Sequence, residues 1–184
     1  MRQSSLIPFL FMATSLKNLS DFNTSGTQDM SAKRFGIVVS EWNTEVTESL
    51  FSGAMETLLK MGVRRENIQR INVPGSFELP LAAQKLAQLE EIDAVITLGC
   101  VIQGETRHFD FICQACAQGI TDVGLKYDKP VIFGVLTTDN QKQAMDRAGG
   151  QHGNKGDEAA ERTEYSLRKR RFSSNLALHP SNKS

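Results

Sequence analysis

The chain has 184 residues, enough for one domain with a full hydrophobic core. Apolar residues make up 40% of it and charged residues 23%, as is ordinary for a globular protein. Lysine plus arginine and aspartate plus glutamate number 21 each, so no overall field favours nucleic acid or an anionic membrane. No stretch is long and apolar enough to span a bilayer, so we expect neither nucleic acid nor membrane as a partner.

The first 33 residues are predicted to be a disordered extension. They are rich in Ser, Thr and Asn and show no hydrophobic periodicity. Arg2 precedes a short apolar run at 6–13, a pattern that resembles a weak signal or transit segment. We favour the extension over the targeting segment, and we expect a cytoplasmic protein.

The folded part is predicted to begin with a buried strand, RFGIVVS at 34–40, which is apolar and rich in β-branched residues. Apolar residues then recur at three- and four-residue steps over 46–61, which predicts a helix with one apolar face. Asn43 can cap the start of this helix, and Gly62 ends it. A second strand follows at 68–73 and stops at the segment PGSFELP.

The middle of the chain continues the same alternation. A helix is expected at 81–89, a strand at 94–98 (AVITL), a helix at 106–124 and a fourth strand at 130–136 (PVIFGVL). Strands that are apolar without polar alternation are typically buried on both faces. The order therefore predicts an α/β domain in which helices are layered on a parallel sheet.

The last predicted helices flank a glycine-rich segment. Thr138 or Asp139 can cap a helix that runs to residue 148, and the link GGQHGNKG leads to a final helix at 157–170. We expect one domain at 34–170 and a disordered tail at 171–184.

The loop GCVIQGET after the third strand is the first candidate site. It has the Gly-x4-Gly spacing of a nucleotide-binding loop, but Glu105 stands where that loop needs lysine, so a triphosphate site is excluded. A single phosphate would still suit a helix start with free N–H groups, with Gly104 allowing close approach and Thr106 adding a donor. The alternative, a plain helix cap by Thr106, stays open.

Two further residues can serve a phosphate site. His108 lies near the start of that helix, where the helix dipole favours a neutral, basic ring, as a general base or proton shuttle needs. Arg147 could supply a bidentate cation, although its spacing alone fits a surface arginine better. A structural role for His108 is the alternative reading.

Aromatic and polar residues at the strand ends could bind a planar heterocycle. Trp42, Phe77 and Phe133 could stack on it, although core packing is the default role of such residues. Glu78 could accept hydrogen bonds from a polyol, or could simply be an acid favoured at a helix start. Lys155 stands between glycines ahead of the last helix.

The three cysteines, Cys100, Cys113 and Cys116, are too few and odd in number for a disulfide framework, which fits a reducing cytosol. Cys113 and Cys116 form a CxxC in a helical stretch without a second ligand pair nearby. We interpret them as buried small apolar residues and expect no metal site.

Three segments resemble the lumazine synthase family. They are PGSFELP, GCVIQGETRHFDFI and GVLTTDNQKQAMDRAGGQHGNKGDEAA, and they occur in the family's order and spacing. The similarity runs from about residue 35 to about 167. It implies a three-layer fold with a four-stranded parallel, flavodoxin-like sheet flanked by helices.

The resemblance implies a transferase that needs no metal or organic cofactor. Such enzymes condense 5-amino-6-ribitylaminouracil with 3,4-dihydroxy-2-butanone 4-phosphate to 6,7-dimethyl-8-ribityllumazine, and they release phosphate and water, in riboflavin biosynthesis. In the family pattern His108 would shuttle protons, and Arg147 would hold the phosphate together with Gly104, Glu105 and Thr106.

The pyrimidine and ribityl pocket is also implied by the resemblance. Trp42 would stack on the pyrimidine. The rest of this pocket would be formed by Asn43, Ser76, Phe77, Glu78, Val101, Ile102, Phe133 and Lys155.

The family assembles as homopentamers, with the site between neighbouring subunits, or as hollow shells of twelve pentamers. The short link GGQHGNKG modestly favours the shell. The resemblance leaves open whether riboflavin synthase associates with it. The alternative function is a shell that binds lumazine or flavin without catalysis, and retention of both His108 and Arg147 argues against it. A flavodoxin-like electron carrier is weaker, because Glu41, Trp42 and Asn43 stand where its phosphate loop would lie.

Overall fold

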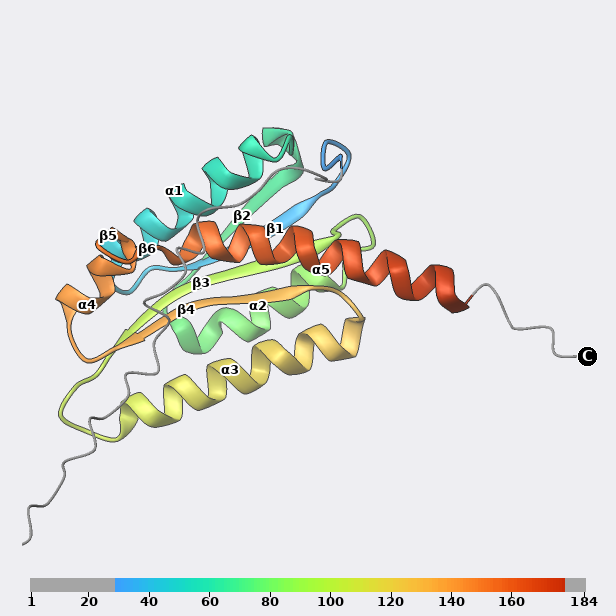
Figure 1. Cartoon of the computed structure of the whole chain (residues 1–184). Coiled ribbons are helices and arrows are strands. Elements are labelled where there is room, and N and C mark those ends of the chain that lie inside the picture. Colours follow the sequence, from blue (N-terminus) through green and yellow to red (C-terminus); the bar gives the residue numbers. More distant parts are fainter. Residues whose placement is uncertain (1–28, 178–184) are drawn as a thin grey trace, which may run out of the picture.

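The computed structural model describes residues 29–177, with side chains described over 29–170. Most of the predicted extension and half of the predicted tail lie outside the described residues. Within them, a four-stranded, all-parallel sheet forms the centre of the molecule (Figure 1), in the order β2-β1-β3-β4. The strands are β1 (Phe35–Ser40), β2 (Ile68–Val73), β3 (Ala94–Ile102) and β4 (Val131–Thr138). The predicted α/β, flavodoxin-like sheet is confirmed.

Helices cover both faces of the sheet, which makes three layers (Figure 1). The first face carries α1 (Thr44–Lys60) and α5 (Lys155–Ala177), and the second carries α2 (Leu79–Ala87) and α3 (His108–Tyr127). A short helix, α4 (Gln141–Asp146), follows β4.

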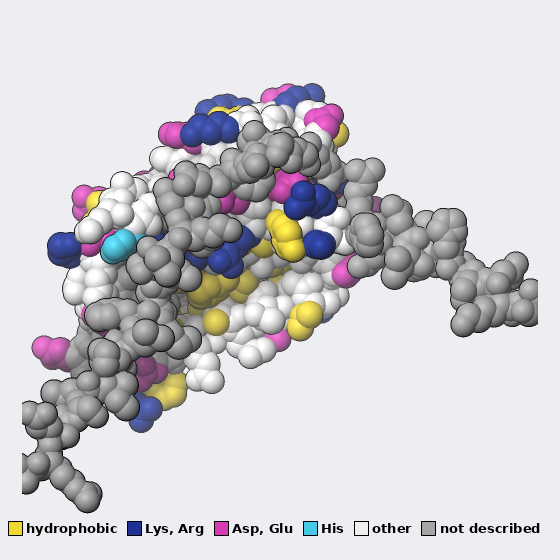
Figure 2. Space-filling model, viewed as in Figure 1, with side chains coloured by type: hydrophobic (Ala, Val, Ile, Leu, Met, Phe, Trp, Pro, Cys, Tyr) yellow, Lys and Arg dark blue, Asp and Glu magenta, His cyan; other side chains and the backbone are white. Residues whose placement is uncertain are grey.

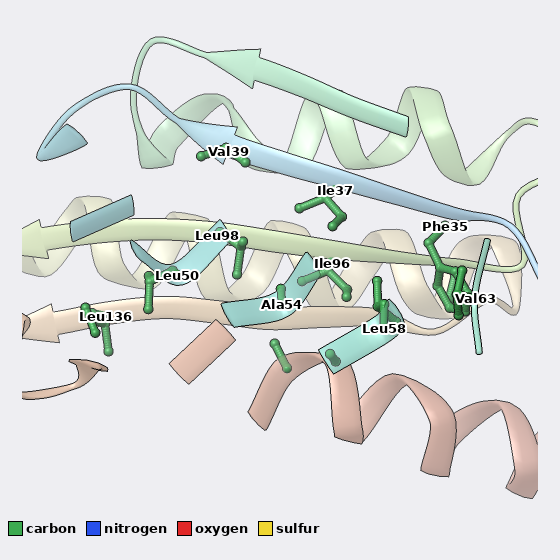
Figure 3. Packing of buried hydrophobic residues seen from close by; sticks show 14 of the residues in the cluster. Phe35, Ile37, Val39, Leu50, Ala54, Leu58, Val63, Ile96, Leu98 and Leu136 are labelled. Carbon is green, nitrogen blue, oxygen red and sulfur yellow. The ribbon is translucent and has the colours of Figure 1, made fainter. Parts of the chain in front are cut away.

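Each face of the sheet has its own hydrophobic core, because side chains alternate along a strand. Ile37 and Leu98 point into the cluster under α1 and α5, where they meet Leu50 and Ala54 (Figure 3). Val38, the neighbour of Ile37, points to the opposite cluster under α2 and α3. Both clusters consist of buried residues, which explains why β1 and β3 read as apolar runs.

Several element ends differ from the prediction. The strand β3 runs four residues past its predicted end, because its backbone stays paired with β4 as far as Ile102 and Thr138. The helix α2 begins two residues early, since Pro80 lies in its first turn, where proline is tolerated. The helix α5 begins at Lys155 and continues to Ala177, so the predicted tail is helical over its first seven residues.

The glycine-rich link folds into a small hairpin, which the sequence did not predict. It consists of β5 (Ala148–Gly150) and β6 (Gly153–Asn154), paired antiparallel. Gly149 and Gly153 have φ values of 100° and 78°, a backbone region that strongly favours glycine. The glycines therefore form a tight turn rather than a loose linker.

Of the two predicted helix caps, one lies at the predicted residue and the other is wrong. Asn43 does precede α1, but in a left-handed conformation, and its side chain donates to the Cys100 carbonyl oxygen at 2.9 Å instead of capping. Asn140, rather than Thr138 or Asp139, caps α4 by accepting from the Gln143 N–H at 3.0 Å. Gly62 does end α1, as predicted.

The described part of the chain begins with a buried residue. Met30 is fully buried in the core cluster under α1 and α5, although the fold was predicted to start at Arg34. Acidic and basic side chains are interspersed on the face shown in Figure 2, as expected from their equal numbers. Among the helices described over 29–177, none is long and apolar enough to cross a membrane.

Candidate active site

A pocket of about 830 Å³ lies beyond the carboxyl ends of β1, β2 and β3, where open α/β sheets bind their ligands. It is lined by the loop after β1, the turn after β2, the end of β3 and the start of α3. Ten of the fourteen predicted site residues line this one pocket: Trp42, Asn43, Ser76, Phe77, Glu78, Val101, Ile102, Gly104, Thr106 and His108.

The loop after β1 is held rigidly while its aromatic side chain stays free. The Trp42 N–H donates to the Pro74 carbonyl oxygen at 3.1 Å, and Asn43 reaches across to Cys100 on β3. The Trp42 side chain is 72% exposed and lines the pocket. An indole on a fixed backbone, open to solvent, can stack on a planar ligand at low entropic cost.

The turn after β2 presents a carboxylate to the pocket. Ser76, Phe77 and Glu78 form a 3-10 turn, and Glu78 Oε2 accepts from the Gly75 N–H at 3.0 Å. This bond supports the capping role that the sequence left open. It uses one oxygen and fixes the orientation of the carboxylate, whose other oxygen remains available to a ligand hydroxyl group.

Two buried hydroxyl groups lie near Gly99, and one of them belongs to Ser76, which lines the pocket. Ser40 and Ser76 are buried, and neither hydroxyl oxygen has a hydrogen-bond partner among the described residues. A Cβ at Gly99 would lie 2.6 Å from Ser76 Oγ and 3.4 Å from Ser40 Oγ. Buried hydroxyls are normally hydrogen-bonded, so these two groups are suited to a polar group or a water molecule.

The predicted phosphate loop lies at the start of α3. The helix begins at His108, two residues later than predicted, and this exposed histidine lines the pocket. Thr106 Oγ1 accepts from the His108 N–H at 3.3 Å, so it acts as a cap, while its hydroxyl hydrogen stays available to an anion. Glu105 is exposed and does not line the pocket.

The other predicted residues lie apart from the pocket of this chain. Phe133 is on the edge strand β4 and is 36% exposed. Arg147 follows α4, and Lys155 begins α5. Both cations form ion pairs of 2.9 Å with the side chain of Glu158, so Arg147 is not the solvated surface arginine that its spacing suggested.

Six lining residues were not predicted: Pro74, Gly75, Cys100, Phe109, Phe111 and Ile112. Phe111 and Ile112 lie three and four residues after His108, so helical periodicity could have placed them on the same face. Phe77 and Phe111 are 57% and 62% exposed. With Trp42, they give the pocket an exposed apolar rim of the kind that binds a ligand or a partner chain.

The thiols contribute no reactive group to this site. Burial raises the pKa of Cys100 to about 11 and that of Cys116 to about 12, so both stay protonated at neutral pH. Cys116 is buried as predicted, whereas Cys113 is partly exposed. Among the described side chains, no group of three His, Cys, Asp or Glu residues is placed to hold a metal ion.

Comparison with known proteins identifies the family. The profile of the 6,7-dimethyl-8-ribityllumazine synthase family matches residues 32–167. The chain belongs to this family. The match includes both the pocket and the separate residues Phe133, Arg147 and Lys155.

Individual lumazine synthases are closely similar. The chain is 64% identical to that of Cytophaga hutchinsonii over 149 residues, which cover 81% of this chain and 93% of the relative. It is 55% identical to that of Parabacteroides distasonis with the same coverage. It is 47% identical to that of Flavobacterium psychrophilum over 172 residues, 94% of this chain and 90% of the relative.

Proposed function

We propose that this chain catalyses the lumazine synthase reaction of riboflavin biosynthesis. It condenses 5-amino-6-ribitylaminouracil with 3,4-dihydroxy-2-butanone 4-phosphate to 6,7-dimethyl-8-ribityllumazine and releases phosphate and water. The observation that carries this proposal is the gathering of ten predicted family residues in one pocket, in a chain that belongs to the family.

The ribitylaminouracil would bind between the aromatic rim and the turn after β2. Trp42 would stack on the pyrimidine ring, with Asn43, Val101 and Ile102 beside it. The oriented carboxylate of Glu78 would accept hydrogen bonds from ribityl hydroxyl groups. These roles suit an exposed aromatic ring and a carboxylate with one oxygen already fixed.

The phosphate would bind at the start of α3. This helix is 20 residues long, and its free N–H groups and partial positive charge favour an anion. The Thr106 hydroxyl would donate to the phosphate, and Gly104 has open space around it for close backbone approach. Arg147 would add the bidentate cation that stabilises developing charge as phosphate leaves.

The proposed reaction depends more on proton transfer than on chemical activation of the two substrates. The ring amine attacks the ketone, and loss of water gives an imine. Elimination breaks the C–O bond to phosphate, and attack by the ribitylamino nitrogen on the remaining carbonyl group, with loss of a second water molecule, closes the second ring. His108, exposed at the pocket wall, would carry protons to and from the reacting nitrogen and oxygen. Holding two already reactive substrates together would supply much of the rate.

The site would be completed by a second copy of the chain. Phe133, Arg147 and Lys155 do not line the pocket of their own chain, and the pocket has an exposed apolar rim. We therefore propose a homopentamer in which these residues face the neighbouring pocket, with a 60-subunit shell as its larger form. The three free cysteines fit a reducing compartment such as the cytoplasm.

An assay with both substrates tests the proposal. Lumazine absorbance and phosphate release would be followed above the uncatalysed rate, with Arg147→Ala beside the wild type. We expect acceleration by the wild type and a loss of at least tenfold in kcat/KM for Arg147→Ala, about the value of one charged hydrogen bond.

The matched control is Arg162→Ala, an exposed arginine on α5. It should leave both products at the wild-type rate. A correctly assembled wild type without acceleration would instead favour a shell that only binds lumazine or flavin.

A further inference from the structure

Glu158 is a buried carboxylate that serves two cations at once. It lies in the first turn of α5, and its side chain is only 6% exposed. Glu158 Oε1 accepts from Arg147 Nη2 at 2.9 Å, and Glu158 Oε2 accepts from Lys155 Nζ at 2.9 Å. Each oxygen therefore has its own charged donor.

The backbone around Glu158 holds the same two cations together. Arg147 Nη1 donates to the His152 carbonyl oxygen at 3.1 Å, and the Lys155 N–H donates to the Arg147 carbonyl oxygen at 2.9 Å. Asn154 ties the hairpin to α1 by donating to the Ser49 carbonyl oxygen at 2.9 Å. The hairpin β5-β6 thus brings Arg147 back to the start of α5, where Glu158 can reach it.

Electrostatic repulsion by itself would separate the side chains of Arg147 and Lys155. Two cations that share one carboxylate repel each other once it is removed, and both side chains are long and flexible. A buried carboxylate with both oxygens occupied holds them in one geometry, because leaving either oxygen or either cation unpaired is costly.

We propose that Glu158 is a positioning residue that couples the two substrate subsites. This inference rests on the proposed function, in which Arg147 meets the phosphate, and on the place of Lys155 in the pyrimidine pocket that the family resemblance implies. By holding both, one carboxylate fixes the phosphate subsite relative to the pyrimidine subsite. The carboxylate also reduces the summed charge of Arg147, Lys155 and Glu158 to a single positive charge.

The test compares Glu158→Gln with Arg147→Ala and Lys155→Ala. Glutamine keeps the size, but its amide presents an N–H group to one of the two cations. We expect KM to rise about tenfold for both substrates in Glu158→Gln. Arg147→Ala should raise mainly the KM of the butanone phosphate, and Lys155→Ala mainly that of the pyrimidine. Adding Glu158→Gln to Arg147→Ala should raise the phosphate KM little further, because the two residues act as a unit.

Two controls separate positioning from a purely structural role. Glu161→Gln removes a carboxylate one turn further along α5 that contacts neither cation among the described residues, and it should keep both KM values. Glu158→Asp keeps the charge but is one methylene shorter, and it should give intermediate KM values. Unchanged KM values with a fall in kcat and Tm together, in both Glu158 variants, would overturn the proposal.

Binding of inorganic phosphate, followed by 31P NMR, tests the inference without turnover. Wild type should bind phosphate, and Glu158→Gln should bind it about tenfold more weakly with normal assembly and Tm. Equal or tighter binding by Glu158→Gln would overturn the inference, since the carboxylate would then oppose the anion rather than orient its cation. If the wild type binds phosphate but converts neither substrate, the proposed function would be refuted, whereas the role of Glu158 in phosphate binding would stand.

Discussion

The free space around a residue of the site decides whether a larger side chain can replace it. Gly104 lines the pocket and Gly99 packs against Ser76, which also lines it, yet the surroundings of the two glycines are opposite. A Cβ at Gly99 would lie 2.6 Å from Ser76 Oγ and 2.9 Å from Leu79 Cδ1, whereas a Cβ at Gly104 would meet nothing within 4 Å. The first glycine therefore serves packing, and the second leaves space for a ligand.

The pair Gly99→Ala and Gly104→Ala tests this difference. We expect Gly99→Ala to cost about 1–3 kcal/mol of folding free energy, as overpacked cores do, and to raise the KM of the pyrimidine by displacing Ser76. Gly104→Ala should keep the wild-type Tm. Thermal unfolding of both variants checks this, and equal Tm values would contradict the steric argument.

At the scale of elements, α5 carries two acidic residues, Asp157 and Glu161, whose ionisation opposes folding. Burial, then repulsion by Asp157 and Glu158, raises the pKa of Glu161 from 4.5 to about 7. Burial also raises the pKa of Asp157. A folded-state pKa above the unfolded one means that the folded state binds more protons, so stability falls as pH rises through this interval.

Glu161→Gln should remove the part of this pH dependence that comes from Glu161. At about pH 3.5, well below the unfolded pKa of 4.5, the folded and unfolded wild type are both largely protonated at this residue, so the variant should match it in Tm. At pH 8 the wild type carries the full penalty, so the variant should melt at a higher temperature. Scans at both pH values measure the difference, and a gap that does not widen with pH would refute the assignment.

The element boundaries show what local patterns can predict. The strand at 68–73 and the glycine at the end of α1 match the prediction, since both depend on the preferences of neighbouring residues. The end of β3 does not, because pairing with β4 continues over residues 99–102, past the predicted end at Leu98. The hairpin β5-β6 was likewise hidden in a glycine-rich segment with no strand pattern.

At the scale of the whole molecule, the candidate site is divided into two parts. His108 lines the pocket, whereas Arg147 is held by Glu158 and does not line it. If two copies of the chain complete one site, variants that each lose one part should complement each other.

Mixed assemblies of His108→Ala and Arg147→Ala chains test that arrangement. After reassembly of an equal mixture, roughly a quarter of the sites should combine an intact pocket with an intact Arg147, as random mixing of two chains requires. The mixture should therefore exceed the mean rate of the two separate variants. Activity equal to that mean would show that each chain completes its own site.

The sequence alone determined the α/β class, the family and most of the pocket, because the family motifs follow the strand ends and these ends meet at one edge of the sheet. Only the tertiary structure showed that Glu158 joins Arg147 to Lys155, and that these cations lie apart from the pocket. Motif spacing identifies residue types along the chain. The Arg147–Glu158 ion pair and the steric contacts depend on where the hairpin and helices bring distant residues together, so the sequence pattern could not predict them.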